Sequence, residues 1–576
     1  MDKGTISAII IALVALLAGT SCVVPNVQSR QPIRPYTFMI YVDPISGNCA
    51  AKDAYGAIRW SSISSTSVFN SAISASTTGE TILVKTGTYS LNGSITGTGK
   101  DNITLTFENG ATLFVSNGMN APAIILKNCR NWRISGVTIN GNAANQAITN
   151  GVHGIAIESS RNCRVDGVRI HNVRTFGYVS SICVNVGITN SKITNCGWNG
   201  IELGGNCGGE VSTYAMNNEV AYCGDVGIST YGVSTLIQNN YVHDMNGATG
   251  YNNAQWGIAV EAGGNNTITG NTVKNCLYGI VIGYGSNIIS GNTVLDAGKD
   301  GIHIGANDDG NMVTDNSVTG WNKKLQADYG IYIGGDRNTV RNNVLSTTYS
   351  HDAMGMYVTG SHNQILGNSI NVGANLNYIV DVAGGTENTL AHNTISGGNN
   401  GAGSAIVIRT GVTGTIIGEN DLRKCANVPL SDSGTYSQIT DPTMDPANLG
   451  NLGVLTGQIE TVTVNDAVTA GQVVFHNSTG WFLASATSTS TMTKEVAVTL
   501  QSAASGSACR IMRNGYMRND AWASMTVGVG IYASTTAGKF TQTPPSGSGN
   551  VIYDLGKANG LHTIKFYDSG AWETHN

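Results

Sequence analysis

A repeat of glycine–apolar pairs and asparagines occupies the chain from about Ile124 to Leu422. Each unit has a Gly followed by Ile or Met and, later, an Asn two positions before Val, Ile or Leu. The glycines are Gly200, Gly227, Gly257, Gly279, Gly301, Gly330 and Gly355, and the asparagines are Asn218, Asn240, Asn271, Asn292, Asn316, Asn342, Asn368, Asn393 and Asn420. Successive asparagines lie 21 to 31 residues apart, a period typical of a solenoid of short strands and turns. The sequence therefore predicts about 14 stacked coils, with the Asn ladder in a structural role.

Individual coils have the alternation of β-strands. Asn131–Asn142 and Asn162–Val173 both alternate apolar and polar residues at period two. Within Ser67–Ser76 the apolar residues have helical spacing, which predicts a short helix that caps the open first coil. The solenoid is expected over residues 36–430.

The residue pattern changes after the repeat. Residues 431–457 contain two Asp-Pro pairs and no periodicity, which indicates a linker. Residues 458–576 have alternating runs such as QVVFHN and EVAVTL between Gly, Ser and Pro-Pro breaks, which predict a small antiparallel β domain. The expected fold class is all-β: a parallel β-solenoid with an N-terminal capping helix and a separate C-terminal β domain.

Residues 1–22 have the pattern of a signal peptide or a lipoprotein-type signal. The apolar run Ile6–Ala18 is short for a membrane span and suits the core of an export signal. Cys22 follows Ser21 as the candidate for a membrane lipid anchor, although Gly19 stands where that pattern has Leu; an uncleaved anchor is the alternative. We expect a secreted or cell-surface protein.

The net charge and the cysteine positions limit which partners and which kinds of site are expected. Charged residues make up 12% of the chain, the net charge is -5, and no basic run occurs, so nucleic acid is not an expected partner. Cys196, Cys223, Cys276 and Cys425 each follow an apolar strand residue by three positions. This spacing favours an inward stack of small residues over disulfides, and the absence of Cys-x-x-Cys argues against a metal site.

Two segments resemble known families. AISASTTGETILVKTGTYSL and the coils after it, about residues 36–425, resemble right-handed parallel β-helix families that include pectate lyases, polysaccharide epimerases, periplasmic carbohydrate-binding proteins and phage tailspikes. This resemblance implies a polysaccharide or cell-surface glycan as partner and, for the tailspike type, a homotrimer. AGQVVFHNSTGWFLA and DLGKANG are similar to a small β module of viral and prophage tail or surface proteins, which carries no catalytic motif.

Candidate functional residues come from two outward columns. If the Ile of each Gly-Ile pair points inward, the next residue points outward from a parallel sheet. The first column is Glu202, Ser229, Ala259, Val281, His303, Tyr332 and Tyr357, and two residues on lie Gly204, Tyr231, Glu261, Gly283, Gly305, Gly334 and Thr359. The glycines leave a low floor, as a groove for a polymer requires; a role in turns alone is the alternative.

Coils lie roughly 4.8 Å apart, so His303, Tyr332 and Tyr357 are expected to form a ladder. His303 and Tyr332 are the predicted catalytic pair, a base and an acid for β-elimination or epimerisation beside a sugar carboxylate. A stacking platform for sugar rings or a plain surface are the alternatives. The predicted substrate-binding residues are Tyr357, Tyr231, Glu261, Glu202, Asp300 and Asp328.

Other chemistries fit less well. A glycoside hydrolase needs carboxylates roughly 5 to 9.5 Å apart, whereas coil spacing puts Glu202 and Glu261 roughly 12 Å apart. The polygalacturonase-type signature and the Asp-Pro-His-Glu string of mannuronan epimerases are absent. No cofactor is predicted; Ala306–Asn311 (ANDDGN) is the one candidate for Ca²⁺, with a polar turn as the alternative.

Three functions follow. The leading hypothesis is a surface protein that binds a polysaccharide, with lyase or epimerase activity as the expected chemistry if it is an enzyme. The second is a virus or prophage tailspike-like adhesin for a host-surface glycan. The third is a non-catalytic structural surface protein in which the solenoid is a rigid spacer.

Overall fold

The computed structural model describes residues 35–575 apart from short gaps. The gaps are 150, 206–208, 246–253, 324–327, 350–352, 374–377, 399–403, 426–427, 436, 440–453 and 493–494. The predicted signal segment, with Cys22, lies outside the described residues. No helix in the described part is long and apolar enough to cross a membrane.

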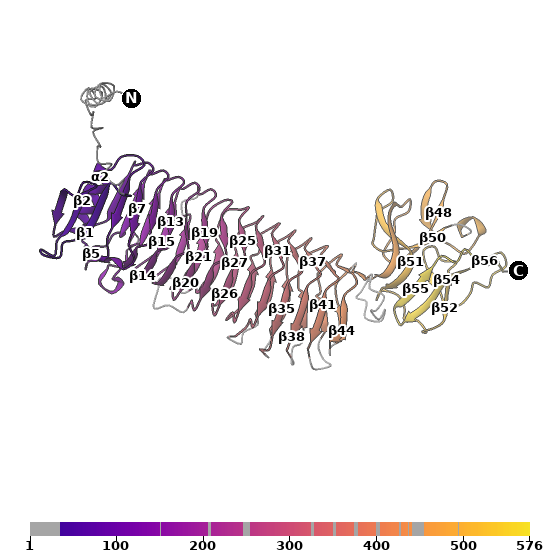
Figure 1. Ribbon diagram of the computed structural model, residues 1–576. Helices are drawn as coiled ribbons and strands as arrows, with labels where there is room; N and C mark the ends of the chain where they lie inside the picture. The colour runs from indigo at the N-terminus through magenta and orange to yellow at the C-terminus, as the bar shows by residue number, and fades with distance from the viewer. Residues whose placement is uncertain are drawn as a thin grey trace, which may run out of the picture.

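Three parallel sheets wind around one elongated core (Figure 1). Each coil contributes one strand to sheet A, one to sheet B and one to sheet C. Sheet A includes β4 (Thr81–Val84), β7 (Thr104–Phe107) and β46 (Gln438–Ile439), and sheet B runs from β5 (Gly87–Leu91) to β44 (Asp421–Cys425). The prediction of a parallel β-solenoid is confirmed, with about 13 turns and, in the described residues, 14 strands in each of sheets B and C.

Sheet C is the sheet that carries the candidate site. Its strands are β6 (Ile95–Thr98), β9 (Ile124–Lys127), β12 (Ile155–Glu158), β15 (Tyr178–Ser181), β18 (Ile201–Leu203), β21 (Val226–Thr230), β24 (Trp256–Val260), β27 (Tyr278–Ile282), β30 (Ile302–Ile304), β33 (Tyr329–Ile333), β36 (Met354–Val358), β39 (Tyr378–Val382), β42 (Ser404–Ile408) and β45 (Val428–Asp432). The pairing is in register, so Ile258, Ile280 and Ile302 stack directly on one another, fully buried. The Ile of each Gly-Ile pair therefore points inward, as expected, and the next residue points outward.

The glycine of each pair is required by close packing between coils. A Cβ on Gly257 would lie 2.2 Å from Cγ1 of Val273 and 2.6 Å from the carbonyl oxygen of Gly279 in the next coil. Gly279 has the same surroundings one coil further on. Because real carbon contacts are much longer, a side chain at either position would push neighbouring coils apart.

Two ladders of asparagine side chains run along the solenoid from coil to coil, one at each of two corners. In the first, Asn292 accepts from both nitrogens of Asn271 at 3.0 and 2.9 Å and donates to Asn316 at 3.0 Å and to the carbonyl of Ile268 at 2.9 Å. The second ladder was not predicted; it includes Asn266, Asn287, Asn311, Asn338, Asn363 and Asn388. Both ladders satisfy backbone groups that the bends leave without strand partners.

One expected ladder position is wrong by a single residue. Asn343, and not Asn342, accepts from the backbone of Asn316 at 3.0 Å. Asn342 has φ 55° and belongs to the turn. The Asn-Asn doublet fits the motif in either register, and core packing decides between them: Leu345 is fully buried, whereas Val344 is 51% exposed.

The column three residues after each sheet B apolar residue points inward, as predicted. Cys196, Cys223 and Cys276 are buried there, in the same column as Met245, Ala297 and Trp321. The side chain of Cys425 lies outside the described residues. Every cysteine described is a buried free thiol, which is how a small apolar core residue behaves.

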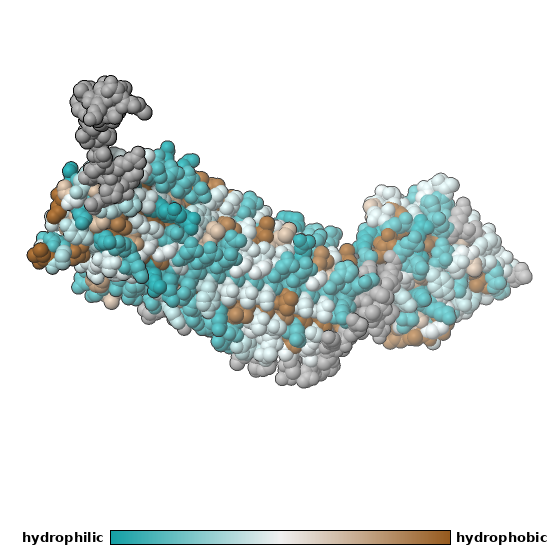
Figure 2. Space-filling model, in the orientation of Figure 1, coloured by the Kyte–Doolittle hydropathy of each residue, from teal (hydrophilic) through white to brown (hydrophobic). Residues whose placement is uncertain are grey.

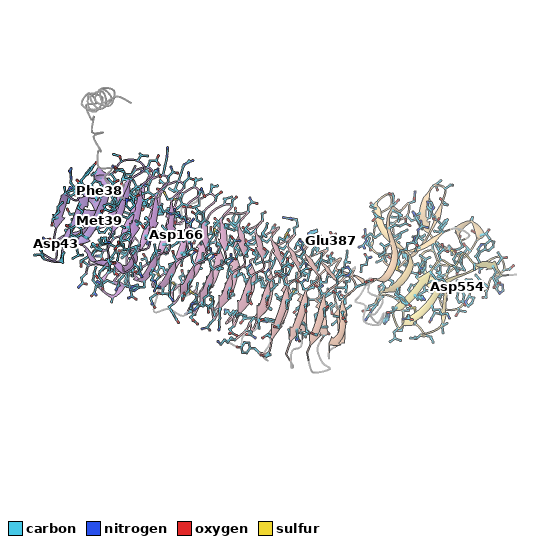
Figure 3. All side chains as sticks on the ribbon, viewed as in Figure 1. Phe38, Met39, Asp43, Asp166, Glu387 and Asp554 are labelled. Atoms are coloured by element: carbon cyan, nitrogen blue, oxygen red, sulfur yellow. The ribbon has the colours of Figure 1, made fainter. Side chains whose placement is uncertain are left out.

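The N-terminal end of the solenoid is closed by the predicted helix and by a small antiparallel layer. Helix α2 (Ser65–Ala75) begins after Ser64, whose side chain accepts from the amide of Ser67, and it buries Val68, Phe69, Ala72 and Ile73. Strands β1 (Phe38–Val42), β2 (Cys49–Asp53) and β3 (Ile58–Ser62) lie beside it. Phe38, labelled in Figure 3 at this end, is buried against the same core.

The C-terminal domain is a separate antiparallel structure, as predicted. Its long strands are β47 (Val454–Thr463), β51 (Ala508–Arg518), β54 (Val551–Gly560) and β55 (Thr563–Tyr567), with Asp554 labelled in Figure 3. It has its own buried clusters, which include Val498, Met512 and Phe566. Strands β45 and β46 of the solenoid fall within residues 428–439, so coil structure continues into the first part of the expected linker.

The Asn ladder generates a stability prediction. Asn292→Ala removes the acceptor of the buried Asn271 backbone amide and a donor to the Ile268 carbonyl, at roughly 1–3 kcal/mol for each group left unsatisfied. We expect the free energy of unfolding to fall by about 3 kcal/mol, measured by chemical denaturation.

The control for this measurement is an asparagine outside the ladder. Asn371 is exposed on β38 (Ser369–Val372), and Asn371→Ala should change the free energy of unfolding by no more than about 0.5 kcal/mol. Equal effects of the two substitutions would contradict the structural role of the ladder.

Candidate functional site

The predicted aromatic ladder is present on the outer face of sheet C. In-register pairing places His303 beside Tyr332 and Tyr332 beside Tyr357. The rings of His303 and Tyr332 are stacked, with centroids 4.5 Å apart and planes 11° apart, and Tyr332 and Tyr357 are 5.9 Å and 18° apart. All three side chains are partly exposed. The structure thus brings together the two predicted catalytic residues and one predicted substrate-binding residue.

Sequence reasoning missed a second row of rings beside this ladder. Trp256, Tyr278 and Tyr329 each stand directly before the Gly of a Gly-Ile pair, and this aromatic-Gly-Ile signal could have revealed them. The Tyr278 ring contacts Trp256 at 6.3 Å and His303 at 5.6 Å, both edge to face. Tyr329 stacks on Tyr357 at 4.5 Å and 12°. We call these six residues, Trp256, Tyr278, His303, Tyr329, Tyr332 and Tyr357, the aromatic band.

A hollow lies at one end of the aromatic band. Trp256, Tyr278 and His303 form its walls, and its volume is about 280 Å³. Gly283 and Gly305 also line it, which agrees with the low floor expected from the glycine column. The hollow is therefore small, mainly apolar and walled by aromatic rings, as binding sites for small rigid groups are.

Asp300 fixes the orientation of the His303 ring. Its Oδ2 lies 2.7 Å from Nδ1 of His303, and its Oδ1 accepts from the backbone amide of Tyr329 at 2.8 Å. The Asp300 side chain is 5% exposed and the imidazole is 29% exposed. A proton on Nδ1 shared with this carboxylate leaves Nε2 as the nitrogen that can accept a proton. Asp300, expected to bind substrate, thus lies beneath the surface and contacts His303.

Asp328 is the second acid at the strand starts. It is 8% exposed, and its Oδ2 is buried without a hydrogen-bond partner among the described residues. Burial, helped by the nearby charge of Asp300, raises the pKa of Asp328 to about 6. The Asp328 carboxyl therefore stays protonated up to about pH 6.

The predicted acidic residues Glu202 and Glu261 form a network with Ser229 and Tyr231. The Ser229 hydroxyl donates to Oε2 of Glu202 at 2.6 Å, and the Asn199 amide donates to the same oxygen. The Tyr231 hydroxyl donates to Oε2 of Glu261. Burial raises the pKa of Glu261, while hydrogen bonding by Tyr231 and Ser229 acts in the opposite direction. Ser229, which lies on the strand after that of Glu202, thus interacts with both carboxyls.

Burial separates Glu202 from solvent. Only 2% of the residue is exposed, and burial, together with the charge of Glu261, raises the pKa of Glu202 to about 7. Burial and the hydrogen bond to Glu261 raise the pKa of the Tyr231 phenol as well. In this conformation Tyr231 and Glu261, both partly exposed, are the members of the network that meet the surface.

The outward column of sheet C that contains His303 continues to an ion pair that the sequence did not suggest. Asp381 lies beside Tyr357 and is fully buried, and Arg409 bonds both of its oxygens, at 2.7 Å from Nη2 to Oδ2. The guanidinium also lies 4.9 Å from the centroid of the Tyr378 ring. This bidentate pair places a guanidinium, its charge balanced by Asp381, at the far end of the aromatic band.

The candidate calcium segment forms a turn. Asp309 accepts from the amide of Asp336 at 2.8 Å and pairs with Arg337 at 2.7 Å, which are contacts of a polar turn. Burial raises the pKa of Asp308. Across the described ranges no three His, Cys, Asp or Glu side chains gather as metal ligands would.

The fold and its outer face define a right-handed parallel β-helix protein. Residues 122–294 and 215–345 match the family model described as right handed beta helix region. A search of curated proteins finds no match. Solved structures similar to this chain include an A-module of mannuronan C-5 epimerase from Azotobacter vinelandii, at 16% identity over 65% of this chain and 93% of that chain, with a TM-score of 0.32.

Two tailspikes are also similar to this chain. They are the Dettilon tailspike protein, at 14% identity over 88% of each chain with a TM-score of 0.40, and the tailspike of E. coli bacteriophage HK620, at 13% identity over 81% of this chain and 92% of that chain with a TM-score of 0.42.

The buried acid generates a prediction about pH. Because folding raises the pKa of Glu202 from 4.5 to about 7, the neutral form favours the fold, and stability falls as pH rises through this window. Between pH 4.5 and 7.5 we expect the free energy of unfolding of Glu202→Gln to fall by about 3 kcal/mol less than that of the wild type. Chemical denaturation at both pH values measures this difference. Glu210, whose pKa burial also raises to about 7, leaves a residual slope.

The matched control is Glu219→Gln. The pKa of Glu219 is lowered by its hydrogen bond to Lys192, so its contribution is lost on acidification and not on a rise in pH. An unchanged slope in Glu202→Gln would mean that Glu202 is charged in the folded protein.

Proposed function

We propose that the outer face of sheet C binds a polysaccharide chain. The observation that carries this proposal is the aromatic band, which extends over five successive strands, β24 to β36, with neighbouring ring centroids 4.5 to 6.3 Å apart. Aromatic faces provide large apolar contact with little loss of side-chain entropy, and the C–H faces of sugar rings pack on them. A site repeated at the spacing of the coils suits a polymer better than a single small molecule.

The surroundings of the band support a carbohydrate ligand. Gly283 and Gly305 leave space for a ring beside His303, and Tyr231, Glu261 and Lys299 supply polar groups for hydroxyls. The proposed contacts with the sugar do not require a basic surface, which agrees with the net charge of -5. Figure 2 presents one mostly hydrophilic face of the solenoid with scattered apolar residues, as a protein working in water at an extended ligand requires.

A second candidate function, proton transfer on the bound sugar, is favoured by the Asp300–His303 pair. His303 Nε2 would take the proton from the carbon beside a sugar carboxylate, while Asp300 stabilises the imidazolium that forms. In β-elimination the electrons of that C–H bond form a C=C bond, the C–O bond breaks, and Tyr332 protonates the leaving oxygen. In epimerisation the proton would return to the same carbon from the opposite face, from solvent, because the stacked rings of His303 and Tyr332 approach the sugar from one side. The adjacent Lys299 ammonium would offset the sugar carboxylate.

The setting we propose is the outside of a cell or virion. It rests on the apolar run Ile6–Ala18 and on the glycan chemistry of the aromatic band. A tailspike-like adhesin would use the same face to hold a host-surface glycan without turnover, as a trimer. Measuring the mass of the purified protein in solution separates a monomer from that trimer.

The first test concerns binding. After a glycan array identifies a ligand, Trp256→Ala and Tyr278→Ala should each weaken binding by about 10- to 100-fold, because an aromatic anchor contributes roughly 1.4–2.7 kcal/mol. Titration calorimetry measures the dissociation constants. Tyr241→Ala is the control, since this exposed tyrosine stacks on His243 of sheet B, away from the band. Equal losses in all three variants, or no glycan bound at all, would refute the proposed face.

The second test concerns turnover. Ultraviolet absorbance of unsaturated products and exchange of solvent deuterium into the sugar report elimination and epimerisation. We expect His303→Ala to abolish either activity. Tyr332→Phe should lower the rate of elimination by about 100-fold. Binding without turnover in the wild type removes the enzymatic candidate and leaves the adhesin. Turnover that survives His303→Ala shows that another residue is the base.

A further inference from the structure

A second hollow lies at the end of sheet B, several coils before the aromatic band. It follows β11 (Thr138–Asn140), β14 (Arg169–Val173) and β17 (Lys192–Cys196), and its volume is about 500 Å³. β14 is labelled in Figure 1 on the indigo-to-purple half of the solenoid.

Arg174 is the charged residue of this hollow, and it has no counter-ion. Its Nε is buried and lacks a hydrogen-bond partner, and no carboxylate pairs with its guanidinium within the described residues. Among the described residues that line the hollow, none is acidic. Arg164 and Arg409, in contrast, pair with Asp166 and Asp381. Arg174 thus places a cation without a described counter-ion at the hollow, and a ligand there would meet the solvent-facing part of the guanidinium and not the buried Nε.

Neutral polar groups surround this cation. Asn172 and Asn195 line the hollow from left-handed turn positions, with φ of 55° and 54°, and their exposed amides make no hydrogen bond within the described part of the chain. Asn142 is different, because its amide already bonds Val115 and Asn117. Tyr222, 43% exposed, supplies an aromatic wall.

We propose that this hollow binds an acidic sugar residue, through a carboxylate or sulfate group on Arg174. A guanidinium offers paired N–H donors that match the two oxygens of such a group. The Asn172 and Asn195 amides would bond the sugar hydroxyls, and the Tyr222 ring would pack on the sugar ring. The site uses none of the residues of sheet C, so it stands or fails independently of the proposed function.

Nearby charges do not change this assignment. On the same sheet, Lys192 is neutralised by its ion pair with Glu219. Burial lowers the pKa of His171, which keeps that imidazole neutral at pH 7. A single cation among neutral amides suits one acidic group on a sugar, whereas a nucleic-acid backbone requires many cations.

The test uses the full-length protein with Trp256→Ala and Tyr278→Ala, so that sheet C does not contribute. The probes are an oligogalacturonate, a sulfated heparin oligosaccharide and a neutral malto-oligosaccharide of equal length, titrated by calorimetry. We expect at least one acidic probe to bind, the neutral probe not to bind, and Arg174→Gln to weaken binding by at least about 30-fold. The acidic probe that binds identifies the group.

Two further variants serve as controls. Arg174→Lys keeps the charge but loses the paired donors, so binding should fall about 10-fold; this comparison stands even if Arg174→Gln does not fold. Arg169→Gln removes an exposed arginine of the same strand and should leave binding unchanged. Failure of both acidic probes, equal binding of the neutral probe, or an equal loss in Arg169→Gln would overturn the proposal.

Discussion

Close contact between successive coils is the constraint on which the rest of the molecule depends. At Gly257 and its equivalents the backbone of one coil approaches the next so tightly that no side chain fits. This approach keeps the parallel strands in register and aligns the buried isoleucines. The same register places outward residues from different coils side by side, so His303 and Tyr332 meet although 28 intervening residues separate them. The aromatic band is therefore a product of the stacking itself.

Periodicity was enough to predict the coils and one column of the site. Strand alternation identified the inward isoleucines and the His303–Tyr332–Tyr357 ladder, because facing direction follows position in a strand. It did not identify the second row of rings, such as Trp256, since only the outward columns after each Gly-Ile pair were followed and the residue before the glycine was not considered. The one-residue error at Asn342 arose because an Asn-Asn doublet satisfies the motif twice, and only packing of the following residues in the core distinguishes the registers.

The burial of outward-facing residues and their rotamers could not be predicted from the sequence. Glu202 has the outward position of a surface residue, yet it is enclosed and shares a hydroxyl with its neighbours. Asp300 and Asp328 also lie inside the structure, and Asp300 is bonded to His303. Coil spacing locates a Cα but not the rotamers or turns that cover it. For the same reason Arg174, which belongs to no repeat motif, gave no signal in the sequence.

The hydrogen bonds of the first Asn ladder all run in the same direction. From Asn218 to Asn393, each side-chain amide donates to the oxygen of the asparagine in the following coil. At one end the oxygen of Asn218 accepts from the backbone amide of Ser191, and at the other the amide of Asn420 donates to the carbonyl of Leu390. Because both ends finish on backbone groups, a whole coil can be duplicated or lost within the ladder with every amide still bonded. The length of the solenoid is thus free to change by whole coils during evolution, provided that each coil brings its asparagine.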